Sequence, residues 1–118
     1  MPIDARLLFI EPQCSLRQIM TKMDENRIGI LLVVDKEDRL VGTITDGDVR
    51  RAFLASYDLE RNASFLLEGK TGSKFSQPIT IGTEASQDEC MQVMHERQIL
   101  YLPKVDAQGR VRSIVSMD

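Results

Sequence analysis

The sequence predicts a mixed α/β (α+β) fold built from two copies of a β-α-β-β unit. Residues 9–46 align without gaps onto residues 80–117, and ten of the 38 aligned positions are identical. Each copy contains a helix-start signal, which is followed by two β-rich runs separated by a short turn. Because similarity at a fixed offset marks repeated structure, the two copies are expected to fold alike.

Composition narrows the class of protein. The chain has 118 residues, a net charge of −3, no tryptophan and one histidine, which is typical of a single domain without the basic surface of a nucleic-acid binder. No apolar run approaches the roughly 18 residues of a membrane span, and no signal-peptide pattern is present. Cys14 and Cys90 lack metal-ligand spacing and are interpreted as structural thiols. We expect a cytoplasmic protein that binds no nucleic acid, membrane or metal.

Each copy opens with a short apolar strand and continues into a helix. The strands are expected at Leu7–Ile10 and at Ile79–Ile81. Ser15 and Ser86 each stand three residues before a Gln or Glu, which is the capping box that starts a helix. Apolar residues at helical spacing are predicted to face the core; they are Leu16, Ile19, Met20, Met23, Cys90, Met91 and Met94.

A β-hairpin is predicted after each helix. The runs ILLVVD and LVGTIT are separated by four residues, and so are YLPKVD and VRSIVS. Ile30–Asp35 lacks alternation, so both of its faces should be covered. Pro103 and Lys104 instead favour a position near a sheet edge for the second copy's run. A further helix, Gly47–Ala55, is predicted after the first hairpin only.

The segment between the copies is interpreted as a linker. It carries a predicted short helix at Ala63–Glu68, followed by the stretch GKTGSK. This stretch lacks the G-x-x-x-x-G-K-[ST] frame of a phosphate-binding P-loop. No phosphate site is therefore predicted there.

The segment VVDKEDRLVGTITDGDVRRA, which closes the first copy, resembles the motif of the CBS domain pair, also called a Bateman module. The resemblance runs from about Leu7 to Asp118. It implies tandem β-α-β-β-α CBS repeats that pack through their sheets about a pseudo-twofold axis. It divides the chain into CBS unit 1 at 1–56, a linker with a short helix at 57–77, and CBS unit 2 at 78–118, which lacks its last helix.

The resemblance also implies a function. Members of this family commonly bind adenosine nucleotides between their two units and form homodimers. We therefore expect a regulatory, non-catalytic module that senses an adenine nucleotide such as AMP or ATP and controls an attached or partner enzyme. The variant TDGDVRR resembles that of CBS pairs attached to sugar-phosphate isomerases and of those that precede sugar nucleotidyltransferases. Because the repeats start close to Met1 and the second unit stops at Asp118, the enzyme is expected to be a sugar nucleotidyltransferase, with this chain as its N-terminal regulatory part.

The segment 46–48, Asp-Gly-Asp, allows three interpretations, of which nucleotide binding is favoured. Amides at the start of a helix attract phosphate. Thr45 supplies a hydroxyl, Gly47 permits close approach of the backbone, and Asp48 can accept hydrogen bonds from ribose hydroxyls. Arg51 is expected to reach the phosphate.

The resemblance assigns the other side of this cleft to the second unit. The base-facing residues are expected to be Ile79, Thr80, Ile99, Leu100 and Tyr101. Tyr101 is either a stacking partner for a purine or a core tyrosine. A second cleft would take Ile28, Gly29, Ile30 and Ser116, and its acidic residue would fall beyond Asp118.

The two other interpretations remain open. Asp46 and Asp48 form a D-x-D pair of the kind that holds Mg²⁺ or Mn²⁺ in transferases, although no other acid or base is placed to complete such a site. Alternatively, Asp46 caps the helix and Asp48 complements its dipole. In that case the chain is a ligand-free dimerisation or interaction module.

Overall fold

The computed structural model describes residues 3–70 and 77–117 and confirms the α+β class. Residues 71–76, which include the last four residues of GKTGSK, lie outside the described residues. The elements run in the order η1 (a 3₁₀ helix, Ala5–Leu8), β1 (Phe9–Ile10), α1 (Leu16–Asn26), β2 (Ile30–Val34), β3 (Leu40–Thr45), α2 (Asp46–Leu54), α3 (Ala63–Glu68), β4 (Ile81–Gly82), α4 (Gln87–Arg97), β5 (Tyr101–Val105) and β6 (Val111–Ser116).

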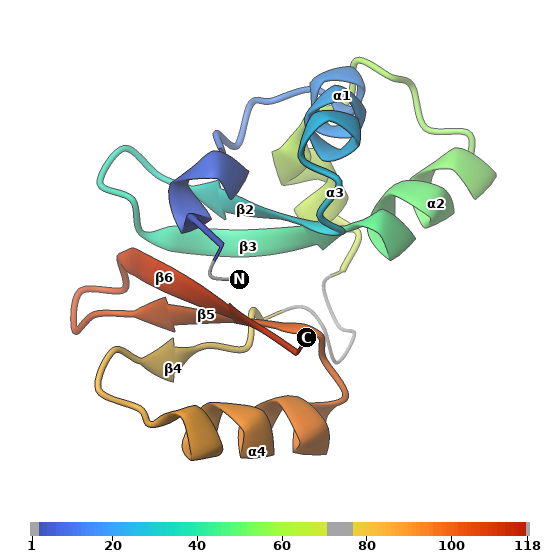
Figure 1. The fold of residues 1–118 in the computed structure, drawn as a ribbon. Coiled ribbons are helices and arrows are strands. Elements are labelled where there is room, and N and C mark those ends of the chain that lie inside the picture. The colour runs from blue at the N-terminus through green and yellow to red at the C-terminus, as the bar shows by residue number, and fades with distance from the viewer. Residues whose placement is uncertain (1–2, 71–76, 118) are drawn as a thin grey trace.

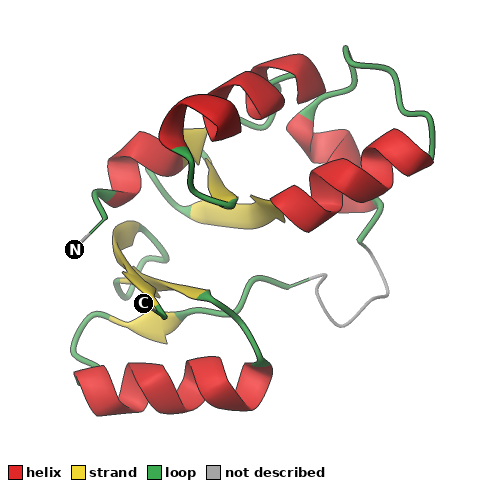
Figure 2. Cartoon of the chain, turned by 45° about the vertical axis from the view of Figure 1, so that its right-hand side comes forward, coloured by secondary structure: helices red, strands yellow, loops and turns green. Residues whose placement is uncertain are grey.

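The strands form two three-stranded sheets with the same topology. Their orders are β1-β2-β3 and β4-β5-β6. In each sheet a short first strand runs parallel to the central strand, and the hairpin partner runs antiparallel to it. The sheets occupy the middle of the molecule, with α1, α2 and α3 outside the first sheet and α4 outside the second (Figure 1). Figure 2 shows the same separation of strands and helices from a second direction.

The opening strands are shorter than expected. Only Phe9–Ile10 of the expected strand Leu7–Ile10 is β structure, because the preceding residues form η1. This turn begins where the Asp4 side chain accepts a hydrogen bond from Arg6 N at 3.0 Å. The second opening strand is likewise displaced from Ile79–Ile81 to β4, which pairs with only two residues of β5.

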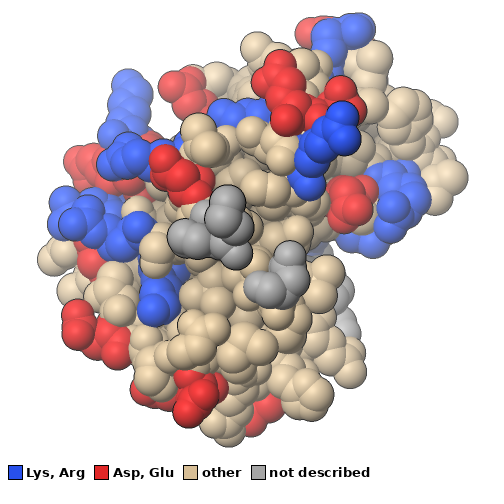
Figure 3. Space-filling view, in the orientation of Figure 1, with Lys and Arg blue, Asp and Glu red and all other residues tan. Residues whose placement is uncertain are grey.

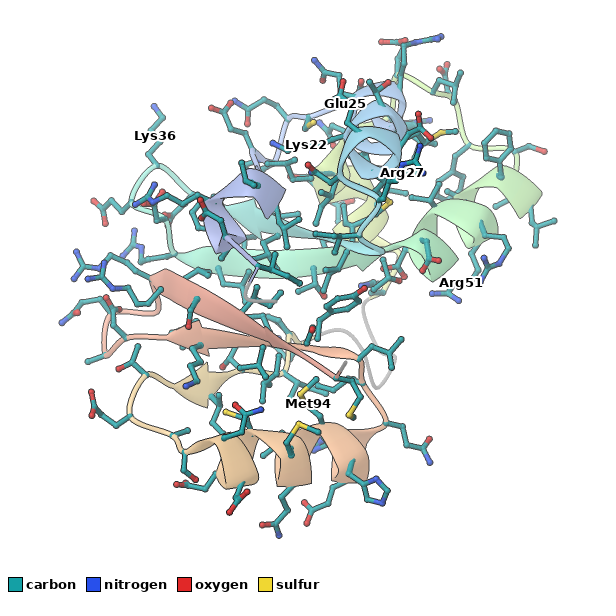
Figure 4. All side chains as sticks on the ribbon, viewed as in Figure 1. Lys22, Glu25, Arg27, Lys36, Arg51 and Met94 are labelled. Carbon is teal, nitrogen blue, oxygen red and sulfur yellow. The ribbon has the colours of Figure 1, made fainter. Side chains whose placement is uncertain are left out.

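The predicted capping boxes and apolar stripes are confirmed. Ser15 Oγ accepts from Gln18 N at 3.1 Å, and the Gln18 side chain accepts from Ser15 N at 2.9 Å; Ser86 and Glu89 repeat this arrangement at the start of α4. Met94 points from α4 toward the second sheet (Figure 4). Of the predicted core residues, those that are buried are Leu16, Ile19, Cys90 and Met94, and those that pack against the core are Met20, Met23 and Met91.

The two central strands differ from each other in sequence but not in position. All five residues of β2 are buried, as its lack of alternation predicts. The prediction of an edge position for YLPKVD is wrong, because β5 is the central strand of its sheet. Pro103 is tolerated because β4 pairs only with the next two residues, Lys104 and Val105. The Lys104 ammonium leaves the sheet and donates to Ala85 O at 3.1 Å.

Helix α3 has the predicted bounds and packs on β3 at Gly42. A Cβ atom at Gly42 would lie 2.7 Å from Leu67 Cδ2, so any side chain at this position would force Leu67 to move. The close packing of α3 on β3 brings Lys70, which follows α3, toward the end of that strand.

The two halves are joined by backbone pairing and by a shared core. Arg39 and Arg110 are equivalent positions of the repeat and pair with each other, as expected near a pseudo-twofold axis. Ile3 pairs with Ile114 of β6. Val111 and Ile114 belong to the same buried cluster as the core of the first half. This packing places the start of α2 opposite segments of the second half.

Candidate functional site

Helix α2 begins at Asp46, and Thr45 is its N-cap residue. Thr45 Oγ1 accepts a hydrogen bond from Asp48 N at 3.3 Å, and the Asp48 carboxylate accepts one from Thr45 N at 2.8 Å. These bonds form a capping box, because the extended backbone at the end of β3 lets the Thr45 hydroxyl reach the third helical residue. The interpretation of Asp46 as the cap is wrong: its side chain is exposed and accepts from Gly47 N at 3.0 Å.

The Asp48 carboxylate lies between two cations. Its Oδ1 accepts from Arg51 Nη2 at 2.7 Å, and its Oδ2 lies 2.8 Å from Lys70 Nζ. Burial by itself raises the pKa of Asp48. Hydrogen bonds from Lys70, the Thr45 amide and Arg51 lower the pKa, and so does the charge of Lys70. Together these interactions outweigh burial and hold the pKa below its ordinary value. Asp48 is therefore an anion at neutral pH.

Lys70 is a charged residue of this region that was not predicted from the sequence. It belongs to the GKTGSK stretch, which was interpreted as a linker without a site. Its side chain is only 14% exposed, and its Nζ donates to Thr43 O at 2.7 Å in addition to contacting Asp48. Lys70 reaches β3 because α3 packs on that strand. A single lysine after a short helix does not allow this contact to be predicted from the sequence.

A pocket of about 310 Å³ lies between the start of α2 and the second half. This volume is at the lower end of the range of about 300–1,000 Å³ that is typical of small-molecule sites. Arg51 extends from α2 on the side that faces the second half (Figure 4). Of the residues predicted for the first cleft, those that line the pocket are Thr45, Gly47, Asp48, Arg51, Ile79, Ile99, Leu100 and Tyr101.

One residue predicted for this cleft lies outside it. Thr80 is exposed and does not line the pocket, whereas its neighbours Pro78 and Ile79 do. Strand β4 begins one residue after Thr80, at Ile81.

The four residues predicted for a second cleft do not share one pocket. Gly29 and Ile30 line the same pocket as Asp48, because β2 runs antiparallel to β3 and begins beside the start of α2. Ile28 lies in a separate shallow groove between α1 and α2. Ser116 pairs with Tyr101 across the second hairpin.

The pocket has a charged end and an apolar end. Arg51 and Lys70 contribute positive charge, and the first amides of α2 contribute partial positive charge. Asp48 is a hydrogen-bond acceptor between them. The apolar wall is made by Pro78, Ile79, Ile99 and Pro103. This arrangement can hold a molecule that carries an anionic group at one end and a flat apolar group at the other.

The D-x-D pair does not converge as a pair of metal ligands. Asp48 is engaged by Arg51 and Lys70, while Asp46 bonds to Gly47 N. Over residues 3–70 and 77–117, no three side chains of the His, Cys, Asp and Glu types gather as potential ligands. A cation at Asp48 would have to displace two positive charges.

Charges of both signs are mixed on the face shown in Figure 3. At the hairpin turns, Arg39 Nε lies 2.8 Å from Asp35 and Arg110 Nε lies 2.9 Å from Asp106. These ion pairs occupy equivalent positions of the repeat. No helix in the described part of the chain is long and apolar enough to cross a membrane.

The fold and the pocket define an α+β module of two repeated units with a small-molecule-sized pocket between them. Residues 3–55 match the family model described as CBS domain. The chain therefore contains a CBS domain, which extends from the residues before η1 to the end of α2.

Curated relatives share sequence with most of the chain. An uncharacterized protein of Rickettsia prowazekii is 33% identical over 84 residues, which cover 71% of this chain and 24% of that protein. The probable arabinose 5-phosphate isomerase of Haemophilus influenzae is 33% identical over 115 residues, covering 96% and 32%. Inosine-5'-monophosphate dehydrogenase of Bifidobacterium longum is 28% identical over 110 residues, covering 93% and 19%. The chain thus spans at most about a third of the length of these relatives.

Solved structures share the fold over both halves. A CBS domain protein from Pyrobaculum aerophilum, complexed with AMP, has a TM-score of 0.78 at 18% identity, covering 96% of this chain and 86% of that one. The cytosolic domain of the Mg²⁺ channel MgtE, in complex with ATP, has a TM-score of 0.76 at 18% identity, covering 99% and 44%. At these identities the likeness shows the fold alone.

Proposed function

We propose that the chain is a regulatory, non-catalytic CBS module that binds an adenine nucleotide, such as AMP or ATP, in the pocket between its halves. One observation carries the proposal: eight of the nine residues expected from the sequence to bind the nucleotide in the first cleft line a single pocket. The AMP complex of a protein with the same fold adds support.

In this proposal the nucleotide bridges the two halves. The phosphate lies at the start of α2, beside Gly47 and Arg51, because the N-terminal end of a helix carries partial positive charge and the Arg51 guanidinium is a charged donor. The ribose hydroxyls bond to the Asp48 carboxylate and the Thr45 hydroxyl. The base lies against the apolar segments of the second half, which contribute Ile79, Ile99, Leu100 and Tyr101.

A ligand that touches both halves can act as a regulator. It favours one relative arrangement of the halves, and its effect is limited to the difference in its affinity for the two arrangements. The controlled enzyme is proposed to be a sugar nucleotidyltransferase, attached or in a partner chain. Two relatives instead carry the names of a sugar-phosphate isomerase and a nucleotide dehydrogenase. These three possibilities are distinguished by assaying the intact protein for nucleotidyltransferase, isomerase and dehydrogenase activity. Each activity is measured with and without AMP and ATP.

Thermal unfolding with added nucleotides tests binding directly. A ligand present at about 100 times its dissociation constant stabilises the folded state by about 2.7 kcal/mol. We expect a concentration-dependent rise in Tm with AMP, ADP or ATP. Asp48→Asn should reduce this rise, whereas Asp88→Asn, a matched change at an exposed carboxylate in the first turn of α4 and outside the pocket, should not. If the intact protein shows no rise with these nucleotides, with GTP or with nucleotide sugars, the sensor function is refuted.

The second candidate function is a ligand-free dimerisation module. Two observations favour it: the hydrogen bonds between Thr45 and Asp48 hold the start of α2 without a ligand, and Phe53 and Leu54 at the other end of α2 are 58% and 81% exposed. A dimer in light scattering combined with no nucleotide-dependent change in Tm supports this candidate. A nucleotide-dependent change in Tm excludes it.

A further inference from the structure

The loop before α1 holds an extended segment of the chain that leads from α2 into α3. Four backbone hydrogen bonds of 2.7–3.0 Å join residues 12–17 to residues 59–64; they run from Leu16 N to Arg61 O, from Arg17 N to Leu59 O, from Ala63 N to Cys14 O and from Ser64 N to Pro12 O. Ser15 and Asn62 form an antiparallel bridge between the same segments. The first half thus contains an example of an extended chain docked at the start of a helix.

The equivalent loop of the second half, residues 83–88, is open. Leu16 of the first loop is completely buried, whereas its equivalent in the repeat, Gln87, is exposed. The amides of Gln87 and Asp88 are the first two of α4, so the helix itself supplies no acceptor for them. Within residues 3–70 and 77–117, neither amide donates to another group. The second loop therefore presents two donors at the positions where the first loop binds its segment.

The second loop also keeps the two acceptors of the first. Thr83 and Ala85 supply the carbonyls at the equivalent positions. Lys104 Nζ donates to Ala85 O at 3.1 Å, but a carbonyl oxygen has two lone pairs and can accept a second hydrogen bond. An extended peptide can therefore pair with this loop through its own backbone, as peptides do when they add to an exposed backbone edge.

The two loops differ in charge. In the first half, Arg17 pairs with Glu60 of the docked segment at 3.3 Å. The residue equivalent to Arg17 is Asp88, and Glu84 and Glu89 stand where the first loop has glutamines. Glu84 and Glu89 also line a hollow of about 470 Å³ that borders the loop. Acidic side chains gather at the lower left of the face in Figure 3, over this loop and the start of α4.

This charge determines which kind of segment fits. A segment with positive charge is attracted to the second loop. Residues 59–64 of a second copy of the chain are disfavoured, because their Glu60 would face Asp88. A helix like α3 is disfavoured as well, since Ser113 stands where β3 has Gly42, the residue that lets α3 pack closely.

We propose that the loop at residues 83–88 docks an extended, positively charged segment of a partner protein by backbone pairing. The carbonyls of that segment accept from Gln87 N and Asp88 N, and its amides donate to Ala85 O and Thr83 O. A lysine or arginine at the position of Glu60 pairs with Asp88. The loop lies outside the pocket between the halves, so this docking does not depend on the proposed nucleotide binding.

The test uses a capped synthetic peptide with the sequence of residues 58–65 and the substitution Glu60→Lys. It is titrated into the isotope-labelled intact protein, and the backbone amide signals are followed by NMR. We expect the signals of Gln87 and Asp88 to shift and to saturate. The peptide that retains Glu60 should bind about fivefold more weakly, because an attractive contact with Asp88 is replaced by a repulsive one. Adding Ala63→Pro to the first peptide removes the donor for Ala85 O and should also weaken binding.

Two protein variants test the assigned contact. Asp88→Arg should reverse the preference, so that the peptide with Glu60 binds better than the peptide with Glu60→Lys. Glu96→Arg is the matched control, because it makes the same change of charge at an exposed position in the last turn of α4 and should leave the preference unchanged.

Three outcomes would overturn the proposal. The first is the absence of any shift of the Gln87 and Asp88 signals at millimolar concentrations of the Glu60→Lys peptide. The second is equal affinity of the unmodified protein for the peptides with and without Glu60→Lys, which would exclude a positively charged partner. The third is a shift of the same two signals with protein concentration in the absence of peptide, which would assign the loop to a second copy of the chain.

Discussion

Asp48 and Lys70 form an ion pair of 2.8 Å that joins the start of α2 to the segment after α3. Both side chains are largely buried, with exposed fractions of 10% and 14%. The pair connects the CBS domain at residues 3–55 to the chain that leads into the second half. The pair also affects the charge of the pocket, because the Asp48 carboxylate forms ion pairs with both Arg51 and Lys70.

The first prediction concerns the pH dependence of stability. The pKa of Asp48 is held below its ordinary value of 3.8, so its ionised form stabilises the folded state. This stabilisation is fully present well above pH 3.8 and is lost as the pH falls through the lower pKa of the folded state. Urea unfolding of the unmodified protein and of Asp48→Asn should show a gap in unfolding free energy that shrinks as the pH falls below 3.8.

The difference between the two proteins isolates Asp48. Asp35 and Asp106 also have lowered pKa values, since each accepts hydrogen bonds at a hairpin turn. Their titration affects both proteins equally and cancels in the comparison. A gap that stays constant with pH would contradict the assigned shift.

The second prediction concerns the close packing of α3 on β3. Gly42→Ala places a methyl group 2.7 Å from Leu67 Cδ2 and 2.9 Å from Leu67 Cδ1. We expect a net loss of about 1 kcal/mol, because overpacking outweighs the entropic gain of replacing a strand glycine. In a Leu67→Ala background the same substitution should be neutral or stabilising. An equal loss in both backgrounds, measured by chemical denaturation, would show that Leu67 is not the cause.

The third prediction concerns the cap of α2. Thr45→Val removes the hydroxyl that accepts from Asp48 N and should cost about 1 kcal/mol of unfolding free energy. Thr45→Ser should keep most of the stability. Ser86→Ala removes the equivalent cap of α4 and should cost a similar amount. Only the Thr45 variant should also weaken AMP binding, because α4 does not line the pocket.

The fourth prediction concerns the apolar wall of the pocket. Tyr101 is half-buried and lines the pocket at the start of β5. If its ring stacks on the base, Tyr101→Ala should weaken AMP binding by about 1–3 kcal/mol, while Tyr101→Phe should retain it. Ribose 5-phosphate has no base, so its affinity should be the same in all three proteins. Equal weakening of AMP and ribose 5-phosphate would assign Tyr101 to the core instead.

The fifth prediction concerns self-association. We expect a homodimer, whose mass in light scattering is twice that of the chain. Leu54 at the end of α2 is 81% exposed, and Leu54→Lys should shift the population toward monomer because it places a charge on an apolar contact. Leu7→Lys is the matched control, since Leu7 in η1 is 59% exposed. A monomer at all concentrations would refute the expectation.

Local patterns predicted much of the secondary structure. Ser15 and Ser86 marked the starts of α1 and α4, because a capping box involves residues only three positions apart. The unbroken apolar run of β2 predicted a fully buried strand. Local evidence gave a wrong prediction at Pro103, which favoured an edge position for its strand. A proline is tolerated in the central strand β5 because β4 pairs only with the two residues that follow Pro103.

The candidate site was predicted only in part. Thr45 and Asp48 were identified because the repeat and the family motif both point to the end of β3. The base-facing residues came from the resemblance, and the structure brings all of them except Thr80 into the pocket. Their role in ligand binding stays a prediction. The capping function of Thr45 was assigned to Asp46, because the helix was predicted to begin at Gly47, one residue later than α2 begins.

The sequence by itself determined the repeat, the helix starts, the hairpins and the fold class, because these depend on contacts between residues that are near in the chain or equivalent in the two copies. Only the tertiary structure decided which residues face Asp48. Lys70 reaches it because α3 packs against Gly42, and Tyr101 shares its pocket because the sheets of the two halves meet. Such contacts join residues far apart in the sequence, and no local pattern records them.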